Sequence, residues 1–277
     1  MLNRKIRLIS LISILGLGVL SSITFGYASW QFNKSDTPVE VINAGVTNNW
    51  TFKDPPPIQP GETIKVDKYG NVSINGEVIE NAEVTYPEDQ VLHGGEVTMN
   101  IGLDENGDLA VTEYAASNIA GNWFTTNAVV NLPEIVSIDG KEYKILGLSQ
   151  PLSMEVGGVI ISKDIYVNVP EGYEYVCDKA FNTISCVRNT TMTFSLPSSL
   201  QYLGYETFKM DINRLTVVID YSGTKDQFKT LIASSADKYG SGYTFFTGAS
   251  DYVYVTCSDG EVIYRPNGQY YSENTNQ

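Results

Sequence analysis

The sequence is poor in the side chains on which most acid–base and metal chemistry depends. Its 277 residues include one histidine and three cysteines. Zinc sites need closely spaced Cys and His ligands, and a single histidine leaves few choices for a general base. A nucleophile elbow, a phosphate-binding loop, a zinc signature and the kinase motifs are also missing from the sequence. We therefore expect a protein that is not an enzyme, with no catalytic residue, no cofactor and no metal.

Positive charge is also scarce. Lys and Arg number 18 against 32 Asp and Glu, which gives a formal net charge of -14. Binding to a phosphate backbone requires a basic patch, and the one early cluster, Arg4, Lys5 and Arg7, belongs to the leader described below. The composition therefore argues against a nucleic-acid partner. Paired carboxylates could still cleave a glycosidic bond, so a glycan-active enzyme is kept as a third alternative.

The cysteines are too few for a disulfide framework. Cys177, Cys186 and Cys257 lie at the ends of apolar stretches, where small buried thiols are common. One disulfide among them remains open. We expect structural thiols rather than metal ligands.

Apolar and turn-forming residues are abundant. Hydrophobic residues make up 42% of the chain, with 18 Tyr and 24 Gly, which indicates a folded protein of mainly β structure with minor α. The N-terminus is basic and is followed by an uncharged run from Leu8 to Gln31. Gly26 and Ala28 precede a possible cleavage site before Ser29, so residues 1–28 are interpreted as a signal peptide or an uncleaved membrane anchor. We expect an extracellular or cell-surface protein that meets the membrane only through this segment.

The residues around the possible cleavage site carry a first resemblance. They are Gly26-Tyr27-Ala28-Ser29-Trp30-Gln31-Phe32, followed by Asn33-Lys34-Ser35-Asp36 and by Val41-Ile42-Asn43-Ala44-Gly45. This stretch resembles the start of proteins exported through the SipW-type signal peptidase, which include matrix proteins of the TasA type and the camelysins. The resemblance implies export from a Gram-positive-type cell. It also suggests a structural component of the cell envelope or extracellular matrix.

Proline and glycine divide the rest of the chain. Consecutive prolines from Pro55 to Pro57 predict an extended linker over residues 29–62. Alternating apolar runs, separated by Tyr69-Gly70-Asn71 and Asn75-Gly76, predict hairpins and a small β subdomain over residues 63–128. Residues 265–277 are interpreted as a polar tail.

The segment Asp104-Glu105-Asn106-Gly107-Asp108 has two interpretations. Its alternating carboxylates are typical of calcium ligands, but an EF-hand needs Gly at position six and Glu at position twelve. A turn centred on Asn106-Gly107 explains the same residues. We favour the turn and leave calcium binding open.

A self-match at an offset of 27 residues is the main structural signal. Ile165-Tyr166-Val167-Asn168-Val169-Pro170 aligns with Met192-Thr193-Phe194-Ser195-Leu196-Pro197. The positions that follow also align: Tyr173 with Leu200, Val176 with Leu203, Ala180 with Thr207, and Phe181 with Phe208. A partial earlier copy begins at Val130. Such a period is typical of units that contribute one strand and a returning arm and must stack to bury their apolar faces.

The pattern apolar-x-apolar-Pro, then an apolar residue, then a Phe resembles the BspA-type leucine-rich repeats of bacterial surface proteins. Lys179-Ala180-Phe181 and Glu206-Thr207-Phe208 fill the last positions, and residues 139–145, 221–228 and 255–260 resemble the family's flanking units. The resemblance implies a short leucine-rich-repeat solenoid over residues 129–264, preceded by the small β subdomain. Near its end, Thr224 and Gln227 form a capping-box pattern that predicts a helix, and residues 252–264 predict a final hairpin.

Export and a solenoid together favour a non-enzymatic binding or adhesion protein of the cell surface, whose partner is a protein or a glycan of unknown identity. Four tyrosines within the repeats, Tyr166, Tyr173, Tyr175 and Tyr202, are candidates for a binding surface. Tyrosine combines apolar area with a hydroxyl that can hydrogen-bond. The alternative for each of them is a place in the core or at the edge of a layer.

Overall fold

The computed structural model describes residues 55–121, 127–157, 163–185, 190–209, 215–247, 253–264 and 270–274. The chain divides into two compact units, Met1–Pro55 and Pro56–Gln277, and everything below concerns the second. The leader and the first part of the predicted linker lie outside the described residues. The prediction of a mainly β fold with minor α is confirmed, since strands of several mixed sheets are accompanied by one described helix.

The first part of this unit, residues 56–121, is called the antiparallel region. Its hairpins are formed by β1 (Ile64–Val66), β2 (Val72–Ile74), β3 (Glu77–Val78), β5 (Glu96–Leu103) and β6 (Leu109–Ile119). Gly70, Asn75 and Gly76 have positive φ, so the turns predicted at these positions are confirmed. Ile58, which was assigned to the linker, is 1% exposed and belongs to the core. The extended segment therefore ends earlier than proline content alone indicated.

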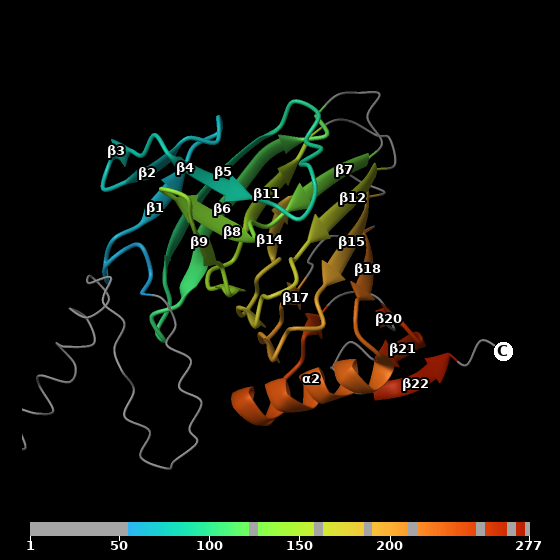
Figure 1. Ribbon diagram of the computed structural model, residues 1–277. Coiled ribbons are helices and arrows are strands. Elements are labelled where there is room, and N and C mark those ends of the chain that lie inside the picture. Colours follow the sequence, from blue (N-terminus) through green and yellow to red (C-terminus); the bar gives the residue numbers. More distant parts are fainter. Residues whose placement is uncertain are drawn as a thin grey trace, which may run out of the picture. The chain divides into compact units, whose positions relative to one another are not determined.

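Residues 127–264 are called the stacked region. Here β7 (Asn127–Asn131), β12 (Lys163–Asn168), β15 (Thr190–Leu196), β18 (Leu215–Tyr221) and β20 (Val253–Cys257) run parallel in one sheet. These strands lie side by side in Figure 1, and β21 (Gly260–Tyr264) and β22 (Tyr270–Asn274) complete the seven-stranded sheet. Val167 pairs with Phe194, so the strand alignment at an offset of 27 residues is confirmed in register.

A second set of short parallel strands repeats the same offset. Tyr175 and Val176 of β13 (Tyr175–Val176) pair with Tyr202 and Leu203 of β16 (Tyr202–Leu203). On its other side β13 pairs with β10 (Gly147–Leu148), which in turn pairs with β6. The antiparallel and stacked regions therefore share a ten-stranded sheet. The boundary predicted between residues 128 and 129 falls inside β7.

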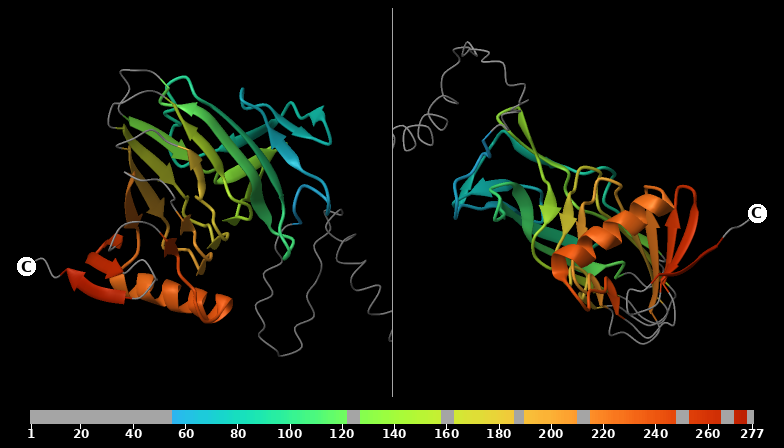
Figure 2. Two further views of the ribbon diagram at one scale, coloured as in Figure 1. Left: turned by 180° about the vertical axis from the view of Figure 1, so that it is seen from behind. Right: turned by 90° about the horizontal axis from the view of Figure 1, so that it is seen from below.

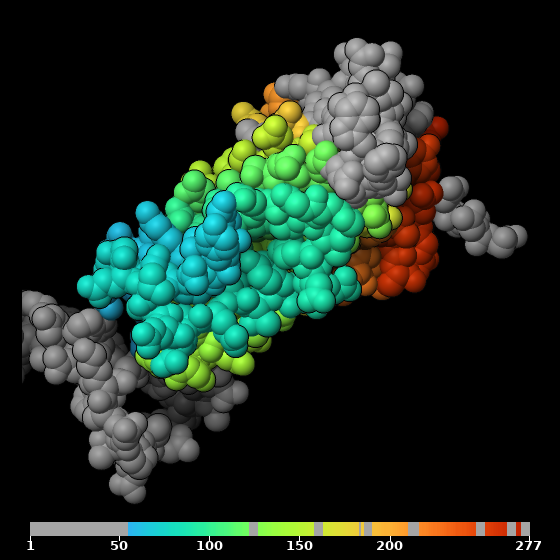
Figure 3. All heavy atoms as spheres, turned by 90° about the horizontal axis from the view of Figure 1, so that it is seen from above, coloured from blue at the N-terminus to red at the C-terminus, as the bar shows by residue number. Residues whose placement is uncertain are grey.

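Further short strands link successive segments. β11 (Ser153–Val156) pairs with β6 and β14 (Thr183–Ser185), and β17 (Phe208–Lys209) pairs with β19 (Phe246–Thr247). β8 (Ile135–Ile138) and β9 (Lys141–Lys144) form a hairpin beside β4 (Ala82–Thr85). This hairpin lies between β7 and β12, where Val130 pairs with Val167. Seen from above, the colours run from cyan through green to red along the unit (Figure 3), so consecutive segments occupy consecutive positions.

One hydrophobic core runs through both regions, and aromatic side chains mark its stacked part. The ring centroids of Phe181 and Phe208, the aligned phenylalanines, lie 5.2 Å apart, and Phe194 lies within 5 Å of both. The turn before each aligned phenylalanine repeats as well, because Lys179 and Glu206 both have positive φ near 50°. The two copies therefore match in backbone conformation as well as in side-chain pattern.

Helix α2 (Lys225–Tyr239) follows β18 and covers the outer edge of β16, which the two views of Figure 2 also show. Its predicted capping box is present, and the Ser235 hydroxyl accepts the backbone N–H of Leu203 at 2.9 Å. The predicted hairpin is confirmed as β20 and β21. Tyr270–Asn274, placed by the sequence in a polar tail, forms an additional strand on β21. Within the described residues, no helix has the length and apolar character needed to cross a membrane.

Candidate functional site

The exposed side of the parallel strands is the first candidate site, and we call it the outer face. Strands β12 and β15 alternate buried and more accessible side chains, so every second residue points outward. The strand registers place one outward side chain of each strand in a continuous row. This row consists of Val129, Tyr166, Thr193, Val218 and Tyr254. Tyr166 is 39% exposed and Tyr254 is 48% exposed.

The outer face carries hydroxyl, amide and carboxylate groups around this row. Asp164 and Thr191 pair beside it on one side, and Asn168, Ser195 and Asp220 follow on the other. The outward positions of the described parallel strands include no Lys or Arg. The face is therefore a mixed aromatic and polar surface whose charge is negative.

The N-terminal edge of this sheet is closed by the chain itself. Val91 and Val129 exchange two backbone hydrogen bonds of 2.9 Å. The Gln90 amide bonds both backbone groups of Asn131, and the Asn131 side chain donates to the carbonyls of Glu88 and Asp89. Another strand cannot add at this edge without displacing these contacts.

The structure separates the four candidate tyrosines. Tyr166 lies on the outer face, whereas Tyr173 is fully buried and donates its hydroxyl to the Pro133 carbonyl at 2.7 Å. Tyr173 is thus a core residue and offers no surface. Its position in the repeat aligns with Leu200, which is also buried, so the sequence contained a signal for this outcome.

Tyr175 and Tyr202 are half-buried neighbours on paired strands away from the outer face. The Tyr175 hydroxyl donates to Oδ2 of Asp104 at 2.8 Å, and burial together with this carboxylate raises the pKa of Tyr175. The Lys238 ammonium lies 4.2 Å from the ring centroid of Tyr202. Tyr175 is therefore engaged within the fold, while Tyr202 lines a groove described below.

Asp104 organises a turn. Its Oδ1 accepts the backbone N–H groups of Asn106 and Asp108, and Gly107 has positive φ. The predicted turn between β5 and β6 is therefore confirmed. Among the described residues, no group of three or more His, Cys, Asp or Glu side chains is arranged to hold a metal ion.

Two of the cysteines are free thiols within the fold. Burial raises the pKa of Cys177 to about 12, and the neighbouring Asp178 carboxylate raises it further. Burial likewise raises the pKa of Cys257 to about 11. Both thiols are thus protonated and unreactive at neutral pH. Cys186 lies outside the described residues.

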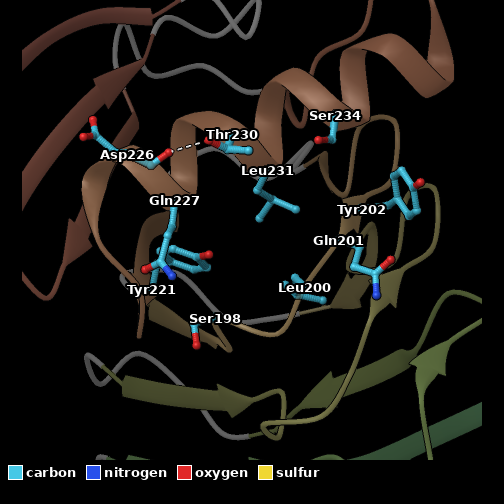
Figure 4. Close-up of a pocket in the computed structure, with 10 residues that line it drawn as sticks. All are labelled: Ser198, Leu200, Gln201, Tyr202, Tyr221, Asp226, Gln227, Thr230, Leu231 and Ser234. Atoms are coloured by element: carbon cyan, nitrogen blue, oxygen red, sulfur yellow. Dashed lines mark hydrogen bonds between the residues drawn. The ribbon is translucent and has the colours of Figure 1, made fainter. Parts of the chain in front are cut away.

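A groove between α2 and the segment Ser198–Tyr202 is the second candidate site (Figure 4). Its volume is about 510 Å³, and Leu200, Tyr221 and Leu231 supply buried apolar area at its base. Ser198, Gln201, Tyr202, Asp226, Gln227, Thr230 and Ser234 complete the lining. The sequence analysis had identified only Tyr202 among these residues as a candidate.

Comparison of the chain with models of known protein families, with curated proteins and with solved structures finds no match.

Proposed function

We propose that this protein is an exported, non-enzymatic binding protein of the cell surface, in which residues 129–264 form a short leucine-rich-repeat solenoid. Two observations support the solenoid. Parallel strands pair at an offset of 27 residues in two separate sheets, and the turns at Lys179 and Glu206 repeat the same backbone conformation. Export rests on the basic and apolar leader of residues 1–28.

The row on the outer face is the observation that carries the binding role. Tyr166 and Tyr254 leave aromatic area exposed on a rigid sheet, with the Thr193 hydroxyl between them in register. Aromatic side chains held on a rigid backbone give contact area at little entropic cost, which suits a protein or glycan partner. The negative charge of this face argues against polyanionic partners.

Substituting the outer row tests this role. We expect the variant carrying Tyr166→Ala, Thr193→Ala and Tyr254→Ala to lose binding of the purified protein to extracellular-matrix proteins, glycans and cells of its own kind. Tyr69→Ala with Val78→Ala is the matched control, because both side chains are highly exposed in the antiparallel region. Unchanged binding by the triple variant, with an unchanged melting temperature, would contradict the proposal.

A structural role in the envelope or matrix is the alternative, and the asymmetry of the sheet edges favours it. The β7 edge is closed by Val91, whereas β22 pairs only with β21 among the described residues. An open strand edge can pair with another chain. Sedimentation velocity should then show concentration-dependent assembly that Tyr271→Lys, a charge on this edge, suppresses. A protein that stays monomeric at all concentrations would rule this role out.

A further inference from the structure

We propose that the groove between helix α2 and the segment Ser198–Tyr202 is a binding site for a neutral oligosaccharide. This inference deepens the proposed binding function and rests on it. It assigns the glycan contact to a place other than the outer face.

The groove has the size and the mixed lining of a ligand site. Its volume of about 510 Å³ falls within the range usual for small-molecule sites. Leu200 and Leu231 give an apolar base, and the Tyr221 ring lies beside them (Figure 4). Such a base matches the C–H face of a sugar ring, which is apolar while its rim carries hydroxyls.

The polar groups around this base are amides and hydroxyls. Among the lining residues drawn in Figure 4, the only hydrogen bond marked is from the Thr230 hydroxyl to the Asp226 carbonyl, at 2.8 Å. The capping bond uses Oε1 of Gln227 and leaves its amide N–H groups available. The Gln201 side chain is exposed at the rim. An amide donates and accepts at once, which is what a sugar hydroxyl requires.

The charges near the groove favour a ligand without charge. Asp226 is the one carboxylate in the lining, and its Oδ1 lies 3.5 Å from the Lys229 ammonium. Lys238 lies over the ring of Tyr202. Glu171 supports the opposite wall, where its carboxylate accepts the Ser198 N–H at 3.0 Å and the Ser222 hydroxyl at 2.5 Å. With two carboxylates and two ammonium groups around it, the groove attracts neither a polyanion nor a polycation strongly.

The contacts of Glu171 also make the wall rigid. Burial raises the pKa of Glu171, but the hydrogen bonds from Ser222 and Ser198 outweigh this effect and leave the pKa below its ordinary value. The carboxylate is therefore ionised at neutral pH and keeps its hydrogen bonds. A prearranged wall lowers the entropic cost of binding a flexible chain of sugars.

The test measures binding of cellotriose, maltotriose and chitotriose to the full chain by isothermal titration calorimetry. We expect at least one neutral trisaccharide to bind, and Gln201→Ala to weaken that binding about tenfold through the loss of hydrogen bonds. Ser234→Trp, which fills the groove, should abolish it. Gln150→Ala is the matched control, because Gln150 is an exposed glutamine outside the groove.

The outcomes separate the groove from the outer face. If Tyr166→Ala abolishes saccharide binding while Gln201→Ala and Ser234→Trp leave it intact, the groove proposal is overturned and the proposed function stands. Loss with the groove variants and none with Tyr166→Ala supports the groove. Binding of a trigalacturonate or a trilysine peptide, with no binding of the neutral trisaccharides, overturns the assignment of ligand class.

Discussion

The antiparallel region and the stacked region pair their strands over very different distances along the chain. In the antiparallel region, β1 and β2 pair through a turn at Gly70, so neighbours in the sheet are neighbours in the sequence. In the stacked region, Val167 must find Phe194 across a full repeat. Local turns specify the first kind of pairing, whereas the second depends on side chains that fit the layer above and below. Substitutions in the two regions should therefore act by different mechanisms.

The largest effect is expected where the layers of the stacked region meet. Phe194→Ala removes a fully buried ring that contacts Phe181 and Phe208, and should lower the free energy of unfolding by about 4 kcal/mol. Urea unfolding followed by far-UV circular dichroism measures this change. Because one core joins both regions, the variant should still unfold in a single transition at lower urea. Ile64→Val in the antiparallel region should shift the same transition by about 1 kcal/mol. Two separate transitions would show that the regions fold independently.

Glycines give a more direct contrast between the regions. A Cβ at Gly204 would lie 2.2 Å from the carbonyl carbon of Cys177, because adjacent layers approach closely there. Gly204→Ala should therefore cost about 3 kcal/mol through overpacking. Gly70 has positive φ and open space around it, so Gly70→Ala should cost only about 1 kcal/mol of backbone strain. Thermal unfolding of the two variants compares them, and equal losses would mean that layer spacing is not a constraint in the stacked region.

The features predicted from the sequence are those that short-range patterns specify. Thr224 and Gln227 lie three residues apart, so their capping box could be recognised. Positive φ at Asn75 and Gly76 follows from residue type. The spacing of Pro170 and Phe181 repeats at Pro197 and Phe208, which was enough to align the layers. In each case the information lies within one unit or in the comparison of two units.

The features that were missed depend on contacts between distant segments. The pairing of β6 with β10 and β11 joins the two regions, and no local pattern announces it. β22 is a polar strand that is ordered by pairing with β21 rather than by burial of its own apolar face. Gln201 and Gln227 come together only because α2 lies against β16. The groove therefore could not be predicted, whereas the outward position of Tyr166 follows from its alternation with Ile165 and Val167.

A hydrogen bond between the two regions provides a smaller test. Asp104 holds its own turn and also accepts the Tyr175 hydroxyl from the stacked region, at 2.8 Å. A double-mutant cycle of Asp104→Asn and Tyr175→Phe should give a coupling energy of about 1 kcal/mol. Asp67 is the control, since it holds an equivalent turn through Tyr69 and Asn71. A cycle of Asp67→Asn with Tyr175→Phe should show no coupling, and equal couplings in both cycles would contradict the specific link.

The smallest effect on stability at neutral pH is expected from the cysteines, all of which belong to the stacked region. In a Cys186→Ser variant, alkylation at pH 8 should modify Cys177 and Cys257 about a hundredfold more slowly than in the unfolded chain, because both thiols are buried and protonated. Burial raises the pKa of Cys177 from 9.0 to about 12, so the folded state keeps this proton to higher pH than the unfolded chain does. The free energy of unfolding should therefore fall as the pH rises above 9 towards 12. Cys177→Ser should reduce this alkaline loss, and rapid labelling of Cys177 at pH 8 would show that the layers of the stacked region open readily.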